Sequence, residues 1–343
     1  MSTTMRAATF DGATSRVSIE TLPIPRPGPD DLLIKVRRCG VCGTDVAMTS
    51  DGPFKFGSGQ FGHEYSGEVI EVGRNVRTHV VGDRIAALPV IGCGRCRGCR
   101  EGNPLLCRNQ ATGMFGFGEY AVIPPKVAIR LPDSLSFADG ALVEPMACGL
   151  HAMRLARVEP GARVLVMGAG SMALAAIYWA RQLGAGRIVV LSRSAHRRDL
   201  AMSMGADAVV GFDPDARARL SEMFGGESPD IVADCVGKPG MIALAADHVR
   251  PGGTILEVGM CMTPEPIVPA RFTFGEIRLL FPMGYTTEEF TATARAFDAG
   301  RLHPESMVSD VITLEDLPVR LETLRKSAGG NLKVHVDLTR RAS

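Results

Sequence analysis

The sequence predicts an α/β fold with two domains, one an antiparallel, barrel-like domain and the other a doubly wound parallel sheet. Short β-like runs punctuated by Gly and Pro fill the chain to about residue 150, as is typical of antiparallel strands joined by close turns. From about residue 161, apolar strands alternate with helical segments, which predicts parallel strands covered by helices. We expect a first domain at 1–150, a second at 151–286, and a tail at 287–343 that returns to the first.

The elements of the second domain follow one another in a regular order. RVLVMGAG predicts a buried strand and a turn, SMALAAIYWARQLGA a helix, and RIVVLSRS a second strand. Beyond these, the pattern predicts helices at 196–206 and 241–253, and strands at 207–212, 230–237 and 254–260. The run ARFTFGEIRLLFPMGY is apolar and β-like, and we expect it near the end of the sheet.

Composition limits the classes of partner. The 343 residues are 45% hydrophobic and 22% charged, with 38 Lys and Arg against 37 Asp and Glu. This balance argues against a nucleic-acid backbone or an anionic membrane as the main partner. The uncharged run 164–180 contains two glycines and is interpreted as strand, turn and helix, not as a membrane span. We expect a cytoplasmic protein, because no apolar segment follows the N-terminus.

Four cysteines in the run GCGRCRGCREGNPLLC, Cys93, Cys96, Cys99 and Cys107, have the spacing of a zinc knuckle. Two short intervals let successive thiolates point inward, and the longer one closes a tetrahedron. A site with four thiolates and no open position is structural. The alternative is two disulfides, which a reducing compartment disfavours. The predicted lobe that holds this structural zinc covers about residues 90–110.

A glycine-rich turn predicts a dinucleotide site. Gly168 permits the tight turn after a strand, and Gly170 lets a pyrophosphate approach the backbone. Ser171 and Met172 open the following helix, whose N-terminus favours the phosphates. Ala173 is small enough for the helix to pack on the strand. The alternative interpretation is a packing turn without a ligand.

The end of the next strand favours NADP over NAD. An NAD site is expected to carry a carboxylate there, for the ribose hydroxyls. This chain has Ser192 and Arg193 instead, with Arg197 close behind, and guanidinium groups suit a 2′-phosphate. The alternative is that these arginines only form a solvated helix start.

A second set of candidate ligands lies upstream, in CGVCGTD, GHEYSGEVIEVGRNV and the later pair Glu144-Pro145. With the cysteine knuckle, the glycine-rich turn and GDRIA in the same order, the chain resembles the zinc-containing alcohol dehydrogenases of the medium-chain dehydrogenase/reductase superfamily. The resemblance covers nearly the whole chain. It implies a GroES-like catalytic domain at 1–150 and 287–343, and a Rossmann domain at 151–286.

The resemblance also implies a catalytic zinc held by Cys42, His63 and an acidic third ligand. Glu64 and Glu144 are both candidates. The Glu144-Pro145 pair resembles the polyol (sorbitol-type), threonine and butanediol dehydrogenase branches, where a glutamate replaces a cysteine. In the polyol branch the glutamate after the histidine can ligate zinc, and the later one holds the zinc-bound water. The sequence leaves this choice open.

Further roles follow from the same resemblance. Zinc would polarise an alcohol oxygen, Thr44 would accept its proton, and Asp45 would orient His63. The chain departs from many relatives at Ala47, where they carry a histidine that completes the proton relay. Lys333 resembles a basic residue near the cofactor pyrophosphate, with an exposed strand lysine as the alternative.

We therefore expect an alcohol dehydrogenase or ketone reductase that contains two zinc ions and uses NADP on a secondary alcohol or polyol. The alternatives are an amino-alcohol oxidoreductase such as a threonine 3-dehydrogenase, which would use NAD, and a cofactor-binding protein without turnover. We expect no nucleic-acid or membrane partner. Because the apolar run at 270–285 often pairs between subunits in this family, we expect a homodimer or homotetramer.

Overall fold

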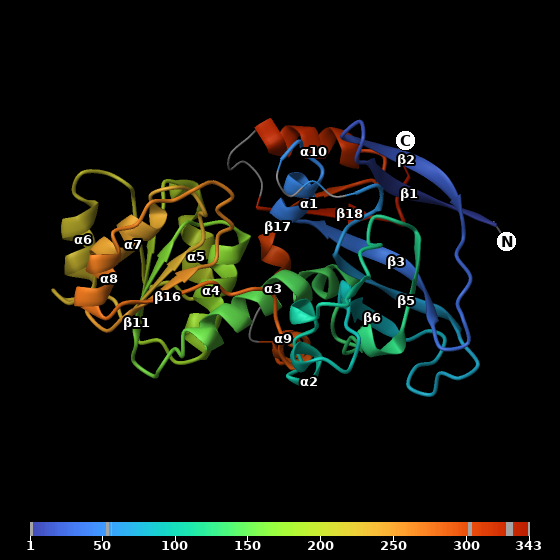
Figure 1. Ribbon diagram of the computed structural model, residues 1–343, viewed down its shortest axis with the longest axis horizontal. Coiled ribbons are helices and arrows are strands. Elements are labelled where there is room, and N and C mark those ends of the chain that lie inside the picture. The colour runs from blue at the N-terminus through green and yellow to red at the C-terminus, as the bar shows by residue number, and fades with distance from the viewer. Residues whose placement is uncertain (1–2, 53–54, 56, 301–303, 327–331, 342–343) are drawn as a thin grey trace. The chain divides into compact units, whose positions relative to one another are not determined.

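The computed structural model describes residues 3–52, 55, 57–300, 304–326 and 332–341. The chain divides into two compact units. The first unit contains Met1–Glu144 and Thr286–Ser343, and the second contains Pro145–Tyr285. The predicted α/β class is confirmed (Figure 1). Helix α3 (Phe137–Leu155) runs across the division, with Pro145 inside it.

The first unit is built on a seven-stranded sheet in the order β10-β6-β5-β3-β18-β17, in which β9 also pairs with β3. All its pairs are antiparallel except β17 with β18. A three-stranded sheet, β2-β1-β4, and the pair β7-β8 complete the strands that the structure describes here. The strands are β1 (Thr4–Asp11), β2 (Arg16–Pro23), β3 (Leu32–Val41), β4 (Gly59–Gln60), β5 (Glu64–Val72), β6 (Arg84–Ala87), β7 (Val90–Ile91), β8 (Ala111–Thr112), β9 (Tyr120–Ile123), β10 (Ala128–Arg130), β17 (Val308–Ile312) and β18 (Lys333–Asp337).

Strand β3 lies at the centre of this sheet because other strands pair with it along both edges, β5 on one edge and β9 and β18 on the other. It pairs with β5 on one side and with β18, whose five residues are all buried, on the other. The C-terminal strand therefore lies beside a strand from the N-terminal part of the chain. The helices of this unit are α1 (Gly43–Met48), α2 (Arg97–Arg100), α9 (Thr287–Asp298) and α10 (Leu317–Lys326), with short 3-10 turns at Pro104–Leu106, Pro125–Val127 and Pro304–Met307.

The second unit is a six-stranded parallel sheet in the order β13-β12-β11-β14-β15-β16. The strand order reverses at β11, which makes the carboxyl end of β11 the place where an open α/β sheet binds ligands. Helix α4 packs on β11, β12 and β14, and α7 packs on β14 and β15. The elements are β11 (Arg163–Met167), α4 (Ser171–Gln182), β12 (Arg187–Leu191), a 3-10 turn (Ala195–Arg197), α5 (Arg198–Ser203), β13 (Ala208–Val210), α6 (Ala216–Met223), β14 (Ile231–Asp234), α7 (Met241–His248), β15 (Thr254–Glu257), α8 (Pro269–Gly275) and β16 (Arg278–Leu280).

The alternating strands and helices predicted for this unit are confirmed, with one correction. The run 270–285 was expected to be β-like, but 269–275 form helix α8 and only 278–280 form strand β16. Pro269 favours a helix start because its fixed φ suits the first turn. The chain leaves the helix at Glu276, which has a left-handed conformation (φ 47°), and continues directly into β16.

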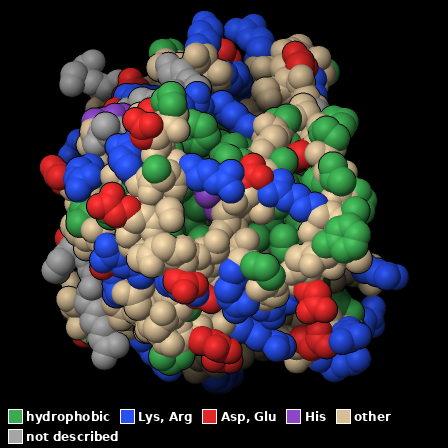
Figure 2. Space-filling view, turned by 90° about the vertical axis from the view of Figure 1, so that its left-hand side faces the viewer, with side chains coloured by type: hydrophobic (Ala, Val, Ile, Leu, Met, Phe, Trp, Pro, Cys, Tyr) green, Lys and Arg blue, Asp and Glu red, His purple; other side chains and the backbone are tan. Residues whose placement is uncertain are grey.

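The surface carries both signs of charge. Figure 2 shows Lys and Arg side chains interspersed with Asp and Glu on the face drawn there, with hydrophobic side chains gathered at several places between them. This mixture agrees with a formal net charge of +1. Among the residues that the structure describes, no helix combines the length and apolar character that a membrane crossing requires.

Candidate active site

Strand pairing brings Cys42 and His63 together. Cys42 follows β3 and caps the N-terminus of α1, while His63 directly precedes β5. In the β3–β5 ladder Gly40 is opposite Glu64. Cys42 and His63 therefore lie at the same end of these two paired strands. Gly62 has a φ of +92°, and a Cβ there would lie 2.6 Å from the Phe117 ring. Only glycine fits at this approach to His63.

Cys42, His63 and Glu64 form one cluster of donors. Each offers one ligand atom, and these atoms all lie within 4.8 Å of one another. His63 and Glu64 are buried, and Cys42 is partly exposed. One sulfur, one imidazole nitrogen and one carboxylate oxygen are a donor set that suits zinc, with a position left for a substrate. The residues present therefore fit a catalytic zinc.

Glu144, the other predicted acid, does not belong to this cluster. It is buried on α3, and it is near enough to Lys333 to contribute to that group's electrostatic surroundings. The structure thus brings Glu64 to the cysteine and the histidine and places Glu144 farther from them.

Asp45 connects the two ligands that the strands bring together. It is completely buried, its Oδ2 accepts the Cys42 N–H at 2.9 Å, and its Oδ1 lies 3.2 Å from His63 Nδ1. Burial alone would lower the pKa of His63, but the Asp45 carboxylate and the Cys42 sulfur raise it well above its usual value. Because Nδ1 faces the carboxylate as an ion-pair partner, Nε2 is the nitrogen left for a metal. Thr44 Oγ1 lies 3.5 Å from Cys42 Sγ, so its hydroxyl is at the same centre.

Lys333 is buried beside the cluster, and the interpretation of it as an exposed strand lysine is wrong. Its Nζ donates to Glu64 Oε1 at 2.7 Å and to Oε2 at 2.8 Å. Desolvation would lower the pKa of Lys333, but Glu64 and Cys42 raise it. Gly40 makes room for the pair, because a Cβ there would lie 2.1 Å from Glu64 Oε2. Neither the pair nor the requirement for Gly40 could be found in the sequence, since no local pattern links residues so far apart.

The four knuckle cysteines also converge. Their sulfur atoms lie within 4.8 Å of one another, and every cysteine in the described structure is free of a disulfide. Backbone N–H groups of Arg95 and Cys96 lower the pKa of the Cys93 thiol to about 6, which favours the thiolate that a metal needs. At Gly92 a Cβ would lie 2.6 Å from Cys99 Sγ. The all-sulfur donor set fits a structural zinc.

The glycine-rich turn has the geometry that a pyrophosphate requires. Gly168 follows β11 with a φ of +106°, and Gly170 caps α4. A Cβ at Gly170 would meet nothing within 4 Å, so the space beside the turn is open. Ser171 and Met172 form the first turn of α4, whose free backbone N–H groups can bind phosphate. These residues fit a dinucleotide.

The polar residues after β12 have different surroundings. Ser192 is buried, and its Oγ accepts the N–H of Ser194 at 3.0 Å. Arg193 is exposed. Arg197 is buried, and its Nη1 donates to the carbonyl of Ala169 at 3.1 Å, so it supports the glycine-rich turn. Of the two predicted phosphate ligands, Arg193 has its side chain in solvent and Arg197 has a position within the fold.

Comparison with known proteins agrees with this geometry. The sequence-family model of the alcohol dehydrogenase GroES-like domain matches residues 28–133. The family model of the zinc-binding dehydrogenases matches residues 170–299. The sorbitol dehydrogenase of Bacillus subtilis is 34% identical, with 97% of each chain covered. The chain belongs to the zinc-containing alcohol dehydrogenase family. It is thus an oxidoreductase of a zinc-dependent family.

Other relatives of this dehydrogenase show the breadth of the family. The L-threonine 3-dehydrogenase of Rhizobium etli is 30% identical, covering 97% of this chain and 99% of that one. A zinc-binding dehydrogenase of Sinorhizobium meliloti, solved bound to NADP, has a TM-score of 0.87 and 32% identity, with 98% and 100% covered. The 2R,3R-butanediol dehydrogenase of B. subtilis has a TM-score of 0.87 and 27% identity, with 97% and 99% covered.

Proposed function

We propose that this dehydrogenase transfers hydride between a secondary alcohol or polyol and NADP(H), forming or reducing the corresponding ketone. The cluster of Cys42, His63 and Glu64, with all three ligand atoms within 4.8 Å, carries the proposal. The sorbitol and butanediol dehydrogenases among its relatives support a substrate with a secondary hydroxyl. A threonine 3-dehydrogenase is the alternative, supported by the relative of that name.

When bound at this cluster, zinc supplies a Lewis acid that lowers the pKa of an alcohol hydroxyl, and the nicotinamide supplies the hydride acceptor. The Thr44 hydroxyl, 3.5 Å from Cys42 Sγ, accepts the proton from the substrate hydroxyl. Asp45 fixes the orientation of His63 and the backbone of Cys42. Lys333 compensates the buried charge of Glu64. Ala47 offers no group for the next proton transfer, so we assign that step to water.

For the acidic ligand we choose Glu64. Its carboxylate lies within reach of Cys42 and His63, whereas Glu144 lies outside the cluster. A carboxylate has about four lone-pair sites, so Glu64 can bind a metal while it accepts from Lys333. Glu144 would then hold water near a metal bound at this cluster. A second zinc would be held by the knuckle cysteines Cys93, Cys96, Cys99 and Cys107.

The preference for NADP depends on the loop after β12. Arg193, exposed beside Ser192, can make two charge-assisted hydrogen bonds to a 2′-phosphate. No carboxylate stands at the end of this strand to accept the ribose hydroxyls of NAD. The S. meliloti relative solved with NADP supports the same choice.

We further propose a homodimer or homotetramer in the cytoplasm. Strand β16 is an edge strand of the described sheet, and an unpaired edge favours association with another strand. Large apolar side chains are exposed next to it, Phe274 at 89% and Phe281 at 64%, which is consistent with a protein interface.

The proposed function is tested with a panel of secondary alcohols, polyols and L-threonine, each assayed with NADP⁺ and with NAD⁺ on zinc-loaded enzyme. We expect the highest kcat/KM for a polyol or secondary alcohol with NADP⁺. Preferential oxidation of L-threonine with NAD⁺ would support the alternative, and no turnover with any substrate would contradict both.

A further inference from the structure

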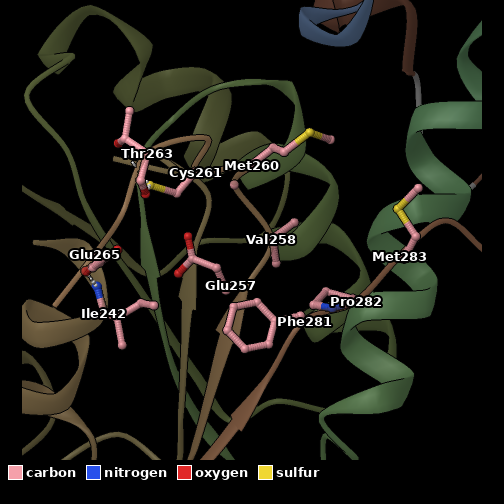
Figure 3. A pocket seen from close by; sticks show the side chains of 11 residues that line it. Ile242, Glu257, Val258, Met260, Cys261, Thr263, Glu265, Phe281, Pro282 and Met283 are labelled. Carbon is pink, nitrogen blue, oxygen red and sulfur yellow. Dashed lines mark hydrogen bonds between the residues drawn. The ribbon is translucent and has the colours of Figure 1, made fainter. Parts of the chain in front are cut away.

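A pocket of about 330 Å³ lies in the second unit, at the carboxyl ends of β15 and β16 (Figure 3). Glu257, the last residue of β15, lies among its lining residues, with Phe281 and Met283 on one side and Glu265 on the other. The pocket therefore combines apolar surfaces with two carboxyl groups. Neither carboxyl has a role in the function proposed above.

The Glu257 carboxyl is buried, and no described group donates a hydrogen bond to it. Its side chain is 6% exposed, and neither Oε atom has a hydrogen-bond partner among the residues that the structure describes. One oxygen of Glu265 is also buried without a hydrogen bond. Its Oε1 accepts the N–H of Ile242 at 2.8 Å, but its buried Oε2 has no partner among the described residues. A buried carboxylate that accepts no hydrogen bond is unfavourable, so this group needs a proton or a ligand.

The parallel ladder puts a second carboxyl beside it. Asp234, completely buried on β14, is opposite Glu257 on β15. Its two oxygens accept the N–H groups of Val236 and Gly237, at 2.8 and 3.2 Å. Asp234 therefore holds its charge more easily than Glu257, and a proton on Glu257 can be donated to it.

The groups around Glu257 are all acidic or neutral. Burial and then the charges of Asp234 and Glu265 raise the pKa of Glu257. Burial together with the charges of Asp234 and Glu257 raises the pKa of the adjacent Cys235 thiol. Cys261 lines the same pocket, and its Sγ lies 3.4 Å from the Thr263 carbonyl oxygen. None of the described residues that line the pocket is basic. Burial and Asp234 together raise the pKa of Glu257 to about 9, so one shared proton decides the charge of the pocket.

The strand order indicates which part of a dinucleotide reaches this pocket. The glycine-rich turn follows β11, and Ser192 and Arg193 follow β12 on one side of it. A dinucleotide whose pyrophosphate lies at the β11 turn extends its other nucleotide over the ends of β14 and β15 on the opposite side. Given the proposed function, that nucleotide is the nicotinamide.

We propose that the carboxyl pair of Asp234 and Glu257 distinguishes the two oxidation states of the nicotinamide. The oxidised ring is a cation, so its binding favours the ionised pair and releases the shared proton to solvent. The reduced ring is neutral, so it binds without this release. A unit charge about 10 Å away, at an effective dielectric constant of about 20, changes a carboxyl pKa by roughly one unit. The inference depends on the proposed function, because the ligand is the dinucleotide.

The test measures binding instead of turnover. Dissociation constants for NADP⁺ and NADPH are determined by calorimetry from pH 7 to pH 9.5, in two buffers of different ionisation enthalpy. We expect NADP⁺ to bind about five- to tenfold more tightly at the higher pH, with proton release, while NADPH affinity stays within about twofold. Equal pH dependence for the two forms, or no proton release with NADP⁺, would overturn the inference and leave the proposed function standing. Failure of both forms to bind at any pH would remove the proposed function as well.

Two variants test whether Glu257 is the group that releases the proton. Glu257→Gln keeps the shape of the side chain and removes its titration, so we expect it to abolish the difference in pH dependence. Glu222→Gln, at an exposed position on α6 of the same unit, should keep the wild-type difference. If Glu257→Gln binds NADP⁺ with unchanged pH dependence, another group releases the proton and the assignment is wrong. The buffer comparison on the wild-type chain shows whether a proton is released, and the Glu257 variant assigns it. If Glu257→Gln does not fold, Asp234→Asn, which removes the other carboxyl of the pair, takes its place, and an unchanged pH dependence there would equally contradict the assignment.

Discussion

Lys333 donates to both carboxylate oxygens of Glu64, at 2.7 and 2.8 Å, although 269 positions separate the two residues in the chain. The side chains are 3% and 0% exposed, so both charges are removed from water. Because such a pair is costly to form and more costly to break, each partner is stable only in the presence of the other. Strand β18 thereby links the C-terminal segment to the candidate zinc site.

Replacing Lys333 is expected to destabilise the first unit strongly. Lys333→Met leaves Glu64 as an uncompensated buried charge, and we expect a loss of about 3–5 kcal/mol in the free energy of unfolding. Urea denaturation measures it on protein without metal at the Glu64 cluster, because a zinc ion bound to Glu64 would itself compensate the charge. Arg97→Ala is the control, because Arg97 forms an exposed ion pair with Glu101 and should cost less than about 1 kcal/mol. A loss for Lys333→Met as small as that of the control would show that the pair contributes little.

The choice between the two acidic ligands can be made by metal analysis. Glu64→Gln removes an anionic oxygen from the donor cluster, so we expect it to lower zinc affinity more than about tenfold and to retain only the knuckle zinc after dialysis. Glu144→Gln should keep both zinc ions and lose activity. The reverse result, with zinc lost only from the Glu144 variant, would make Glu144 the ligand.

Arg193 and Arg197 should affect cofactor binding differently. Arg193→Ala removes the donors for a 2′-phosphate, so we expect KM for NADP⁺ to rise about tenfold or more while KM for NAD⁺ is unchanged. Arg197→Ala removes the bond to the Ala169 carbonyl in the glycine-rich turn, and it should weaken both cofactors. The control is Arg198→Ala, whose exposed side chain donates to the Val209 carbonyl. Equal losses for both cofactors in the Arg193 variant would argue against a phosphate contact.

The knuckle is expected to contribute stability and not chemistry. Cys93→Ser should lower the zinc content by one ion per chain and the free energy of unfolding by about 2 kcal/mol or more, because a metal that binds only the folded chain stabilises it. The kcat per catalytic zinc should change less than about twofold. Arg97→Ala, at an exposed position between the ligands Cys96 and Cys99, is the control. A Cys93→Ser protein with two zinc ions would show that the knuckle does not bind metal.

Glu257 should make stability decrease as pH rises. Burial and Asp234 raise its pKa in the folded chain from 4.5 to about 9, so the folded state holds a proton that the unfolded state releases. The stabilising contribution is therefore complete below pH 4.5 and is lost as pH rises toward 9. Relative to wild type, Glu257→Gln should become more stable with increasing pH, by at most about 1.4 kcal/mol per pH unit. Urea denaturation at pH 6, 7, 8 and 9 measures this, and a constant difference between the proteins would contradict the raised pKa.

Local pattern in the sequence was sufficient for much of the fold. The apolar strand and the glycine-rich turn before α4 were predicted where β11, Gly168 and Gly170 lie, because strand periodicity and a left-handed glycine are local requirements. The run at 269–275 was assigned wrongly, because Phe and Thr favour strands while Pro269 favours a helix start. There, the chain's route between β15 and β16 outweighed side-chain propensity.

By itself the sequence identified the four cysteines of the knuckle, because their short spacing from Cys93 to Cys107 carries the chemistry of a metal site. It offered Cys42 and His63 for a second site and left the acidic ligand there open between Glu64 and Glu144. Only the tertiary structure decided which distant groups meet: Lys333 with Glu64, and Asp234 with Glu257. These pairs arise from strand register, which depends on packing across the whole sheet. Because charges act through space and not along the chain, the electrostatics of this dehydrogenase became visible only in the folded molecule.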